Sequence, residues 1–405
     1  MPNNTTLPAP PPGNATRAIT FLAMAAFAAQ AMVRVTDSLL PQIAADLNTT
    51  VGAASIVVTV YLLAHGSVQL VIGPFGDRLG KYLCIAIAAS VSALMVLACG
   101  LAPTLPLLVA ARLGSGLATG WMVPLALAFI GDVIPYERRQ QVIGTFLSGQ
   151  ILGQMFGQAA GGVLGDYFGW RTVFFMLAGL LAMGTAGLFY ELLRNPVTHP
   201  SRAPTRKSGG FIADNKAVLR SPWSRTLIAL AFVEAASIFG AFAFVGADLH
   251  VRFGESFTIV GLFVGFFALG GLTYSLSVRT LVKRVGPAGL ASGGGMVLAA
   301  AFVILAVEPV AWLAPVAIFG VGLGFYMLHN TLQTNATQMT PEARGTAVGL
   351  FSAGLYLGQT AGSAVGGFVF DRFTAVPVFL GAAVILLLTG LYFSRQLKQR
   401  AARGL

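Results

Sequence analysis

Four ionisable side chains lie inside long apolar stretches of this 405-residue chain: Arg34, Asp37, Arg112 and Glu234. In an apolar solvent a charged side chain costs about 2.5–3.5 kcal/mol, so each should face a partner or a cavity. Side chains in such surroundings commonly carry protons or bind charged substrates. Proton exchange is therefore the first chemistry that the sequence indicates.

Asp37 is the predicted proton carrier. Arg34 precedes it by three residues, which places both side chains on one face of a continuous helix. Burial favours the protonated form of a carboxyl, and a nearby cation favours the ionised form. An acid whose two influences change during a conformational cycle can load and release a proton. A static ion pair with Arg34 is the alternative.

Arg112 and Glu234 lie near the ends of their apolar runs. Glu234 could share proton traffic with Asp37 or bind a cationic substrate. A glutamate that extends towards water is the alternative for Glu234, and an arginine that extends towards the lipid surface is the alternative for Arg112.

Uncharged polar groups also interrupt the apolar runs, and such groups normally face the interior of a helical bundle. The predicted substrate cavity contains Gln150, Gln154, Gln158, Tyr326, His329, Asn330 and Gln333. His329 could titrate near neutral pH, although a neutral imidazole hydrogen-bonded to a neighbour is favoured.

The elements that must position these residues are membrane-spanning helices. Hydrophobic residues make up 56% of the chain and charged residues 10%. A run of about 20 apolar residues crosses a bilayer core of about 30 Å, and in lipid such a run must be helical. We predict an all-α membrane protein with twelve spans, at residues 18–41, 51–73, 83–102, 106–131, 141–165, 172–193, 226–247, 257–281, 288–306, 312–336, 345–369 and 375–394.

The second half of the chain repeats the first. Residue types recur about 205 positions apart, as in Gln154/Gln359 and Asp166/Asp371, and Gly80 pairs with Gly286. Two related halves are typical of secondary transporters that open alternately to each side of a membrane. The predicted domains are a tail at 1–16, a six-helix bundle at 17–193, a linker at 194–225, a second six-helix bundle at 226–395 and a tail at 396–405.

The net charge of +11 reflects membrane topology rather than a nucleic-acid partner. With the N-terminus in the cytosol, only Arg171, Arg252 and Arg372 fall on the outer side, and nearly all other basic residues are cytosolic. This asymmetry follows the positive-inside rule and predicts cytosolic termini, a cytosolic linker and contact with the lipid bilayer. Cys84 and Cys99 both fall in the third span, so no disulfide framework is expected.

A charged motif, GPFGDRLGK, follows the second span at residues 73–81. It resembles the loop signature of the major facilitator superfamily. Gly80 permits a tight turn, and Asp77 could lie at the positive N-terminal end of the eleventh span. The resemblance implies a cytosolic gate built from Gly73, Asp77, Arg78, Gly80, Lys81, Asp132 and Arg139. A solvated charged turn is the alternative for Asp132 and Arg139.

Two further motifs resemble those of this superfamily. The sequence TDSLLP, which begins at Thr36, resembles a signature of its twelve-span drug/proton antiporters. The sequence RLGSG begins at Arg112 and resembles a helix motif of the superfamily, and in proton-coupled members this arginine is tied to proton transfer. A leucine replaces the usual tyrosine of the first motif. Gln158 stands where the antiporter motif of the fifth span has proline, which weakens the case for antiport.

These features together predict proton-coupled efflux of a small amphiphilic drug or metabolite across a bacterial inner membrane. Uptake or facilitated transport of a sugar, amino acid or organic acid is the alternative, and a membrane sensor without transport activity is a third. The sequence contains no nucleotide-binding, metal-binding or hydrolase motif, so we expect no enzymatic activity and no cofactor. The expected partners are the substrate, protons and lipid, and we expect a monomer.

Overall fold

The computed structural model describes residues 13–72, 79–199, 211–340 and 344–403, and these residues contain helices and connecting turns but no strand. Among them, nine helical segments are long and apolar enough to cross a membrane. Two of these segments, of 43 and 51 residues, exceed a single crossing and contain breaks at Gly169 and Gly286. The all-helical architecture is confirmed, and the exact number of twelve crossings stays a prediction.

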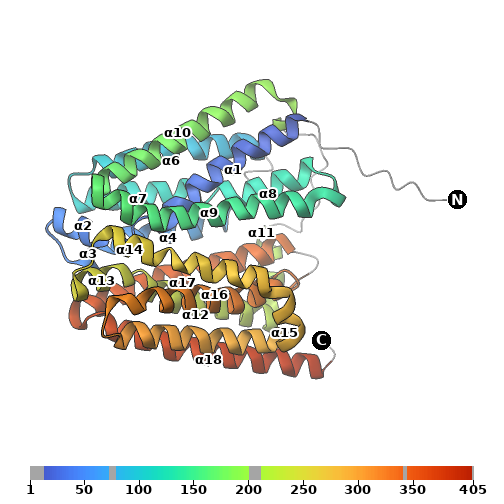
Figure 1. Ribbon diagram of the computed structural model, residues 1–405. Helices are drawn as coiled ribbons and strands as arrows, with labels where there is room; N and C mark the ends of the chain where they lie inside the picture. Colours follow the sequence, from blue (N-terminus) through green and yellow to red (C-terminus); the bar gives the residue numbers. More distant parts are fainter. Residues whose placement is uncertain (1–12, 73–78, 200–210, 341–343, 404–405) are drawn as a thin grey trace.

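The helices of the first half pack in one layer of the molecule (Figure 1). They are α1 (Gly13–Arg34), α2 (Leu40–Asp46), α3 (Val51–Ala54), α4 (Ile56–Val68), α6 (Lys81–Leu101), α7 (Leu105–Thr119), α8 (Met122–Val133), α9 (Tyr136–Phe168) and α10 (Trp170–Arg194), followed by a 3-10 turn at Pro196–Thr198.

The helices of the second half form the other layer (Figure 1). They are α11 (Phe211–Arg220), α12 (Pro222–Phe242), α13 (Val245–Phe253), α14 (Phe257–Val264), α15 (Phe266–Val307), α16 (Ala314–Ala336), α17 (Arg344–Phe373) and α18 (Ala375–Ala402), with a 3-10 turn at Ala311–Leu313 before α16.

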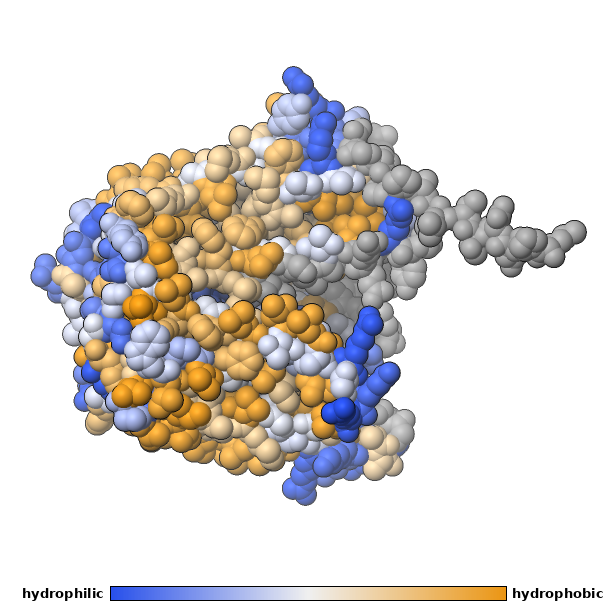
Figure 2. All heavy atoms as spheres, in the orientation of Figure 1, coloured by the Kyte–Doolittle hydropathy of each residue, from blue (hydrophilic) through white to orange (hydrophobic). Residues whose placement is uncertain are grey.

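Each half has its own hydrophobic core. One cluster of buried side chains is drawn almost entirely from α1 to α10, and the other from α11 to α18. Helix α1 begins and helix α18 ends at the same end of the molecule, which we call the terminal end, and α2, α3 and α13 lie at the opposite far end (Figure 1). Hydrophilic side chains gather at these two ends, and a broad hydrophobic band separates them (Figure 2). This distribution is the one that a bilayer imposes on its proteins.

The first predicted span is not continuous. Helix α1 ends at Arg34, and residues 35–39 form turns in which Asp37 N donates to Arg34 O and Leu39 N donates to Thr36 O. Pro41 explains the break, because it has no N–H to donate to Asp37 O and its ring would clash with that carbonyl. Asp37 therefore lies in a break between two helices, so the expectation of a continuous helix was wrong, although the predicted pairing with Arg34 is present.

The predicted linker at 194–225 contains secondary structure. Helix α11 occupies ten of its residues, and α12 begins at Pro222 rather than at residue 226. The domain boundaries otherwise remain predictions.

The internal repeat is visible in the backbone at one pair of glycines. Gly80 precedes α6 with a φ of 93°, and its repeat partner Gly286 interrupts α15 with a φ of 66°. Residues with a Cβ rarely adopt such positive φ values, so both sharp turns depend on glycine. The break at Gly286 also lets the 42 residues of α15 serve as two antiparallel helices (Figure 1).

Candidate functional site: buried ionisable groups between the two bundles

Asp37 and Arg34 form a buried ion pair. Arg34 Nη1 donates to Asp37 Oδ2 at 3.3 Å, and the side chains are 0% and 5% exposed. Asp37 Oδ1 has no hydrogen-bond partner among the described residues. A buried carboxylate with an unused acceptor is costly, so Asp37 is held at the expense of stability.

Arg34 also connects the two halves of the molecule. Its Nη2 donates to Gln359 Oε1 of α17 at 2.5 Å, and its guanidinium lies over the ring of Phe239 in α12, 3.9 Å from the centroid. One guanidinium thus binds the candidate proton carrier and two helices of the opposite bundle. Any change in the charge of Asp37 therefore alters the electrostatic environment of the contact between the halves.

Arg112 is fully buried and does not extend towards the lipid surface. It donates to Val57 O at 3.1 Å, to Met32 O at 3.2 Å and to Thr36 Oγ1 at 3.4 Å. Its guanidinium also lies 4.0 Å from the ring centroid of Tyr61. Arg112 therefore joins α4 and α7 to the break in the first span, and it holds the residue next to Asp37.

A second buried pair lies in the second half. Glu234 of α12 is fully buried, and its Oε2 lies 2.8 Å from His329 Nδ1 of α16. Glu234 Oε1 has no partner among the described residues. The His329 ring stacks on Phe325, which keeps the pair in an apolar environment. Glu234 therefore does not extend to water, and its partner is an imidazole of the neighbouring helix.

The predicted cavity residues divide among several faces. Gln150 and Gln158 of α9 are buried, and Gln154 is half-buried. Four-residue glycine spacing lets α9 approach α1 closely, because a Cβ on Gly157 would lie 2.1 Å from Ala31 O.

In α16 the polar patch splits. His329 turns towards Glu234, whereas Asn330 Nδ2 donates to Tyr274 Oη of α15 at 3.3 Å. Tyr326 packs on Gly271 of the same helix α15, and Gln333 is exposed nearer the terminal end. The structure brings His329 to a titratable partner and leaves the other three outside that pair, so their role in a cavity remains a prediction.

Part of the predicted cytosolic gate can be placed. Lys81 Nζ lies 2.5 Å from Asp132 Oδ2, which connects the start of α6 to the end of α8. Gly80 has the left-handed backbone described above. Gly73, Asp77 and Arg78 lie outside the described residues, as does the side chain of Arg139.

Two symmetric contacts close the far end. Asp166, at the end of α9, accepts from Thr258 N at 3.0 Å and from Thr258 Oγ1 at 2.6 Å. Asp371, its repeat partner at the end of α17, accepts from Gly52 N at 2.8 Å and from Thr50 Oγ1 at 2.5 Å. Each carboxylate joins one half to the first turn of a helix in the other, where partial positive charge is available. We call these contacts the far-end latches.

Gln359 was missed as a site residue, although the repeat contained a signal for it. It is the repeat partner of Gln154, and it lies next to the glycines that recur in the fifth and eleventh spans. Its side chain is 2% exposed and accepts from Arg34. Sequence spacing could not show this contact, because Gln359 and Arg34 are 325 residues apart.

The chain belongs to the Major Facilitator Superfamily, whose family model matches residues 22–342. It is a multi-pass membrane protein of this class. It is 27% identical to the uncharacterized MFS-type transporter YwfA of Bacillus subtilis, over 91% of this chain and 89% of that protein. It is 25% identical to a probable sugar efflux transporter of Pasteurella multocida, again over 91% and 89%. It is 27% identical to a bicyclomycin resistance protein homolog of Haemophilus influenzae, over 89% and 92%.

Solved structures share the fold. The nucleoside transporter NupG superposes with a TM-score of 0.73 at 15% identity, over 94% of this chain and 99% of NupG. A bacterial homolog of the human lysosomal transporter Spinster gives a TM-score of 0.68 at 17% identity, over 95% and 96%. At these identities the likeness concerns the fold alone.

Proposed function

We propose that this protein is a secondary active transporter that exports a small amphiphilic drug or metabolite in exchange for protons. The observation that carries the proposal is the buried chain of contacts from Asp37 through Arg34 to Gln359. It links a titratable group to the interface between the two bundles. Proton uptake at Asp37 can therefore change how the halves meet.

The coupling step follows from the electrostatics of this contact. While Asp37 is ionised, it compensates the charge of Arg34 in apolar surroundings. A proton on Asp37 removes that compensation and leaves Arg34 as an unpaired buried cation, which is strongly unfavourable. Arg34 then gains by separating from Gln359 and reaching water, and this separation opens the bundle interface. Release of the proton restores the ion pair and the closed contact.

The driving force is sufficient for efflux. One proton that moves inward through a potential of 100 mV releases about 2.3 kcal/mol, which supports about fortyfold accumulation per charge. Glu234 and His329 would provide a second proton site in the other half. The names of two relatives, one for sugar efflux and one for bicyclomycin resistance, support efflux as the direction.

The proposal also covers the membrane, the orientation and the oligomeric state of the protein. The terminal end faces the cytosol of a bacterium, the protein lies in the inner membrane, and it acts as a monomer. The basic side chains around the terminal end support this orientation.

The decisive experiment uses purified protein in proteoliposomes. A panel of amphiphilic drugs and metabolites is first screened by thermal shift in detergent, and the compounds that stabilise the protein are then tested for transport. We expect accumulation against a gradient that collapses when a protonophore removes the pH difference. Transport that continues at the same rate without a pH gradient, or with Asp37→Asn, would contradict proton coupling through Asp37.

Uptake or facilitated transport of a sugar, amino acid or organic acid is the second candidate, favoured by the hydrogen-bonding side chains of α9 and α16. Whole-cell accumulation separates the two. Cells that express the protein should hold less of an exported compound than cells without it, and more of an imported one.

A further inference from the structure

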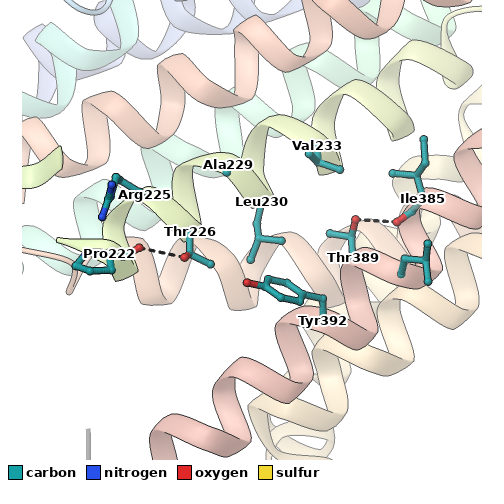
Figure 3. Close-up of a pocket in the computed structure, with 10 residues that line it drawn as sticks. Pro222, Arg225, Thr226, Ala229, Leu230, Val233, Ile385, Thr389 and Tyr392 are labelled. Atoms are coloured by element: carbon teal, nitrogen blue, oxygen red, sulfur yellow. Dashed lines mark hydrogen bonds between the residues drawn. The ribbon is translucent and has the colours of Figure 1, made fainter. Parts of the chain in front are cut away.

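A groove of about 690 Å³ opens on the surface of the second half between α12 and α18. Figure 3 shows its two walls, with Leu230 and Val233 on α12 and Ile385 and Tyr392 on α18. The groove runs along the hydrophobic band and ends at Arg225, near the terminal end of the molecule. No function described above uses it.

The walls of the groove present apolar surface to their surroundings. Two threonines line it, but the Thr226 hydroxyl donates to Pro222 O at 3.0 Å and the Thr389 hydroxyl donates to Ile385 O at 2.7 Å (Figure 3). Both hydroxyls are thus satisfied by their own helices. An occupant of this part of the groove needs only an apolar chain.

The terminal end of the groove is cationic on both walls. Arg225 lines it from α12, and Arg395 extends the α18 wall, because it follows Tyr392 by three residues and Leu388 by seven on one helix face. Both arginines are exposed, and no carboxylate of the described residues forms an ion pair with either. In the first half, the corresponding helices α1 and α10 bring Arg17 onto the buried Glu191 at 2.7 Å. Among the described residues, the second half places no acid beside Arg225 or Arg395.

Aromatic contacts mark this end as the membrane–water interface. The Arg400 guanidinium lies 4.3 Å from the ring centroid of Trp223, and Trp223 stacks on Phe393. Tryptophan and tyrosine next to arginine at a helix end are typical of the headgroup level. Arg225 and Arg395 therefore lie at the depth of lipid phosphates.

We propose that the groove binds an anionic phospholipid, with one acyl chain between α12 and α18 and the phosphate on Arg225 and Arg395. The apolar walls alone cannot select a ligand, because surrounding lipid tails are equally apolar. The unpaired arginines supply the selection, since they favour a headgroup with net negative charge over a zwitterionic one. Glu234 follows the wall residue Val233 in α12, so the bound lipid would also brace the helix that carries the second buried pair.

The test measures which lipid lies next to Trp223. Full-length protein is placed in phosphatidylcholine nanodiscs that contain a small fraction of lipid with brominated acyl chains, which quench nearby tryptophan. Quenching is measured in the unmodified protein and in Trp223→Phe, which keeps an aromatic ring against Phe393. The difference between the two is the quenching of Trp223 itself. Brominated phosphatidylglycerol and brominated phosphatidylcholine are compared.

One arginine near an anionic surface contributes about 1 kcal/mol, which is about fivefold in affinity. We expect phosphatidylglycerol to quench Trp223 at correspondingly lower concentration than phosphatidylcholine. Arg225→Gln and Arg395→Gln should each remove about a fivefold preference, and the double variant should remove the preference entirely. Arg284→Gln removes an exposed charge from the part of α15 that precedes the break at Gly286 and should change nothing.

Trp312 lies at the far end, is 68% exposed and serves as the reference for the bulk bilayer. Its quenching is obtained in the same way, from the difference between the unmodified protein and Trp312→Phe. Equal quenching of Trp223 by the two lipids, or a preference no larger than at Trp312, would overturn the proposal. So would a preference that survives in the double variant. Thermal unfolding of each variant shows that it is folded before the lipids are compared.

Discussion

The two halves bury charge in different ways. The two completely buried arginines, Arg34 and Arg112, are both in the first half, and none of the described arginines in the second half is buried. Both halves bury carboxylates, but those of the second half have no buried arginine beside them: Glu234 lies beside a histidine and Glu308 beside a partly exposed arginine. The two bundles, built from repeated sequence, therefore differ in how their buried carboxylates are paired.

This difference assigns distinct charge states to the two buried pairs. Arg34 stays protonated, so its pair with Asp37 is neutral without an added proton and positive with one. Glu234 faces an imidazole rather than a permanently charged guanidinium. A proton on Asp37 would leave the buried cation of Arg34 without its counter-charge, and the second half has no corresponding buried arginine among its described residues. The comparison predicts that the first half supplies the step that moves the bundles.

The largest effect is expected from the carboxylate of the first half. Asp37→Asn leaves Arg34 unpaired, which removes proton-driven transport and costs about 3–5 kcal/mol of stability. Glu234→Gln keeps a hydrogen-bonding group beside His329, so transport should persist with a shifted pH profile. Proteoliposome transport across a pH series, with denaturation in detergent, measures both variants.

If Glu234→Gln abolished transport as completely as Asp37→Asn, the two halves would share the coupling role and the comparison would fail. Asp37→Glu is the matched control, because it keeps the carboxylate and should retain partial transport.

Arg112 should have the next largest effect, on stability. Arg112→Met leaves Val57 O, Met32 O and Thr36 Oγ1 without their donor, and each buried unsatisfied group costs about 1–3 kcal/mol. We expect a loss of about 3 kcal/mol or more in the free energy of unfolding. The exposed Arg284→Gln should change stability by less than about 0.5 kcal/mol. If Arg112→Met and Arg284→Gln both lowered the free energy of unfolding by the same small amount, the hydrogen bonds of Arg112 would not stabilise the helix packing.

The far-end latches test the symmetry of the halves directly. Asp166→Asn and Asp371→Asn each weaken two charge-assisted hydrogen bonds between bundles, worth about 1.5–3 kcal/mol. Each should shift the population towards opening at the far end by about tenfold. Spin labels on the exposed residues Ala45 and Val251 report this opening as a longer interlabel distance.

Asp46→Asn is the control for the latches, because it removes the same charge at the same end. Asp46 pairs with Arg171 within the first half and not across the bundles. It should leave the distance distribution unchanged. Unequal shifts from the two latch variants would show that one half dominates closure.

The smallest effect concerns the pH dependence of stability. Burial raises the pKa of Glu308 from 4.5 to about 7, although Arg252 opposes this shift. Between these values the folded protein holds a proton that the unfolded chain has released, so the free energy of unfolding should fall as the pH rises through this window. We expect the free energy of unfolding to fall by about 1 kcal/mol, since Glu308 lies at the solvent-facing far end. Glu308→Gln should flatten the profile in denaturation experiments over this range.

The far end of the first half should behave in the opposite way. The hydrogen bond from Arg171 lowers the pKa of Asp46 below its usual 3.8, so this contribution is present at neutral pH and lost as the pH falls below that value. A decrease in stability at rising pH that persisted in Glu308→Gln would locate the effect elsewhere.

Sequence reasoning reached the fold through composition and the repeat. The apolar runs predicted helices, and the family motifs predicted the superfamily, which the family match confirms. Gly80 and Gly286 were paired by sequence and share a left-handed backbone. The break after Arg34 was missed, because a long apolar run outweighed the local effect of Pro41.

Only part of the candidate site could be predicted from the sequence. Asp37, Arg34 and Glu234 stood out as charges in apolar sequence, where any ionisable residue is conspicuous. Their partners Gln359 and His329 carry no net charge signal and lie 325 and 95 residues away. Polar residues of α16 that looked like one patch face different helices, because neighbouring positions on a helix point about 100° apart.

Composition and residue pattern are enough to indicate a membrane protein, its helical class, its two related halves and the few positions where charge enters the hydrocarbon layer. These follow from local chemistry, since a bilayer dictates backbone pairing and penalises charge at any position. Helix packing is what lets Arg34 reach across the bundles, keeps Arg112 within one, and leaves Arg225 without a described carboxylate beside it. Such pairings depend on how distant helices pack, and packing brings together residues whose separation along the chain carries no record of their contact.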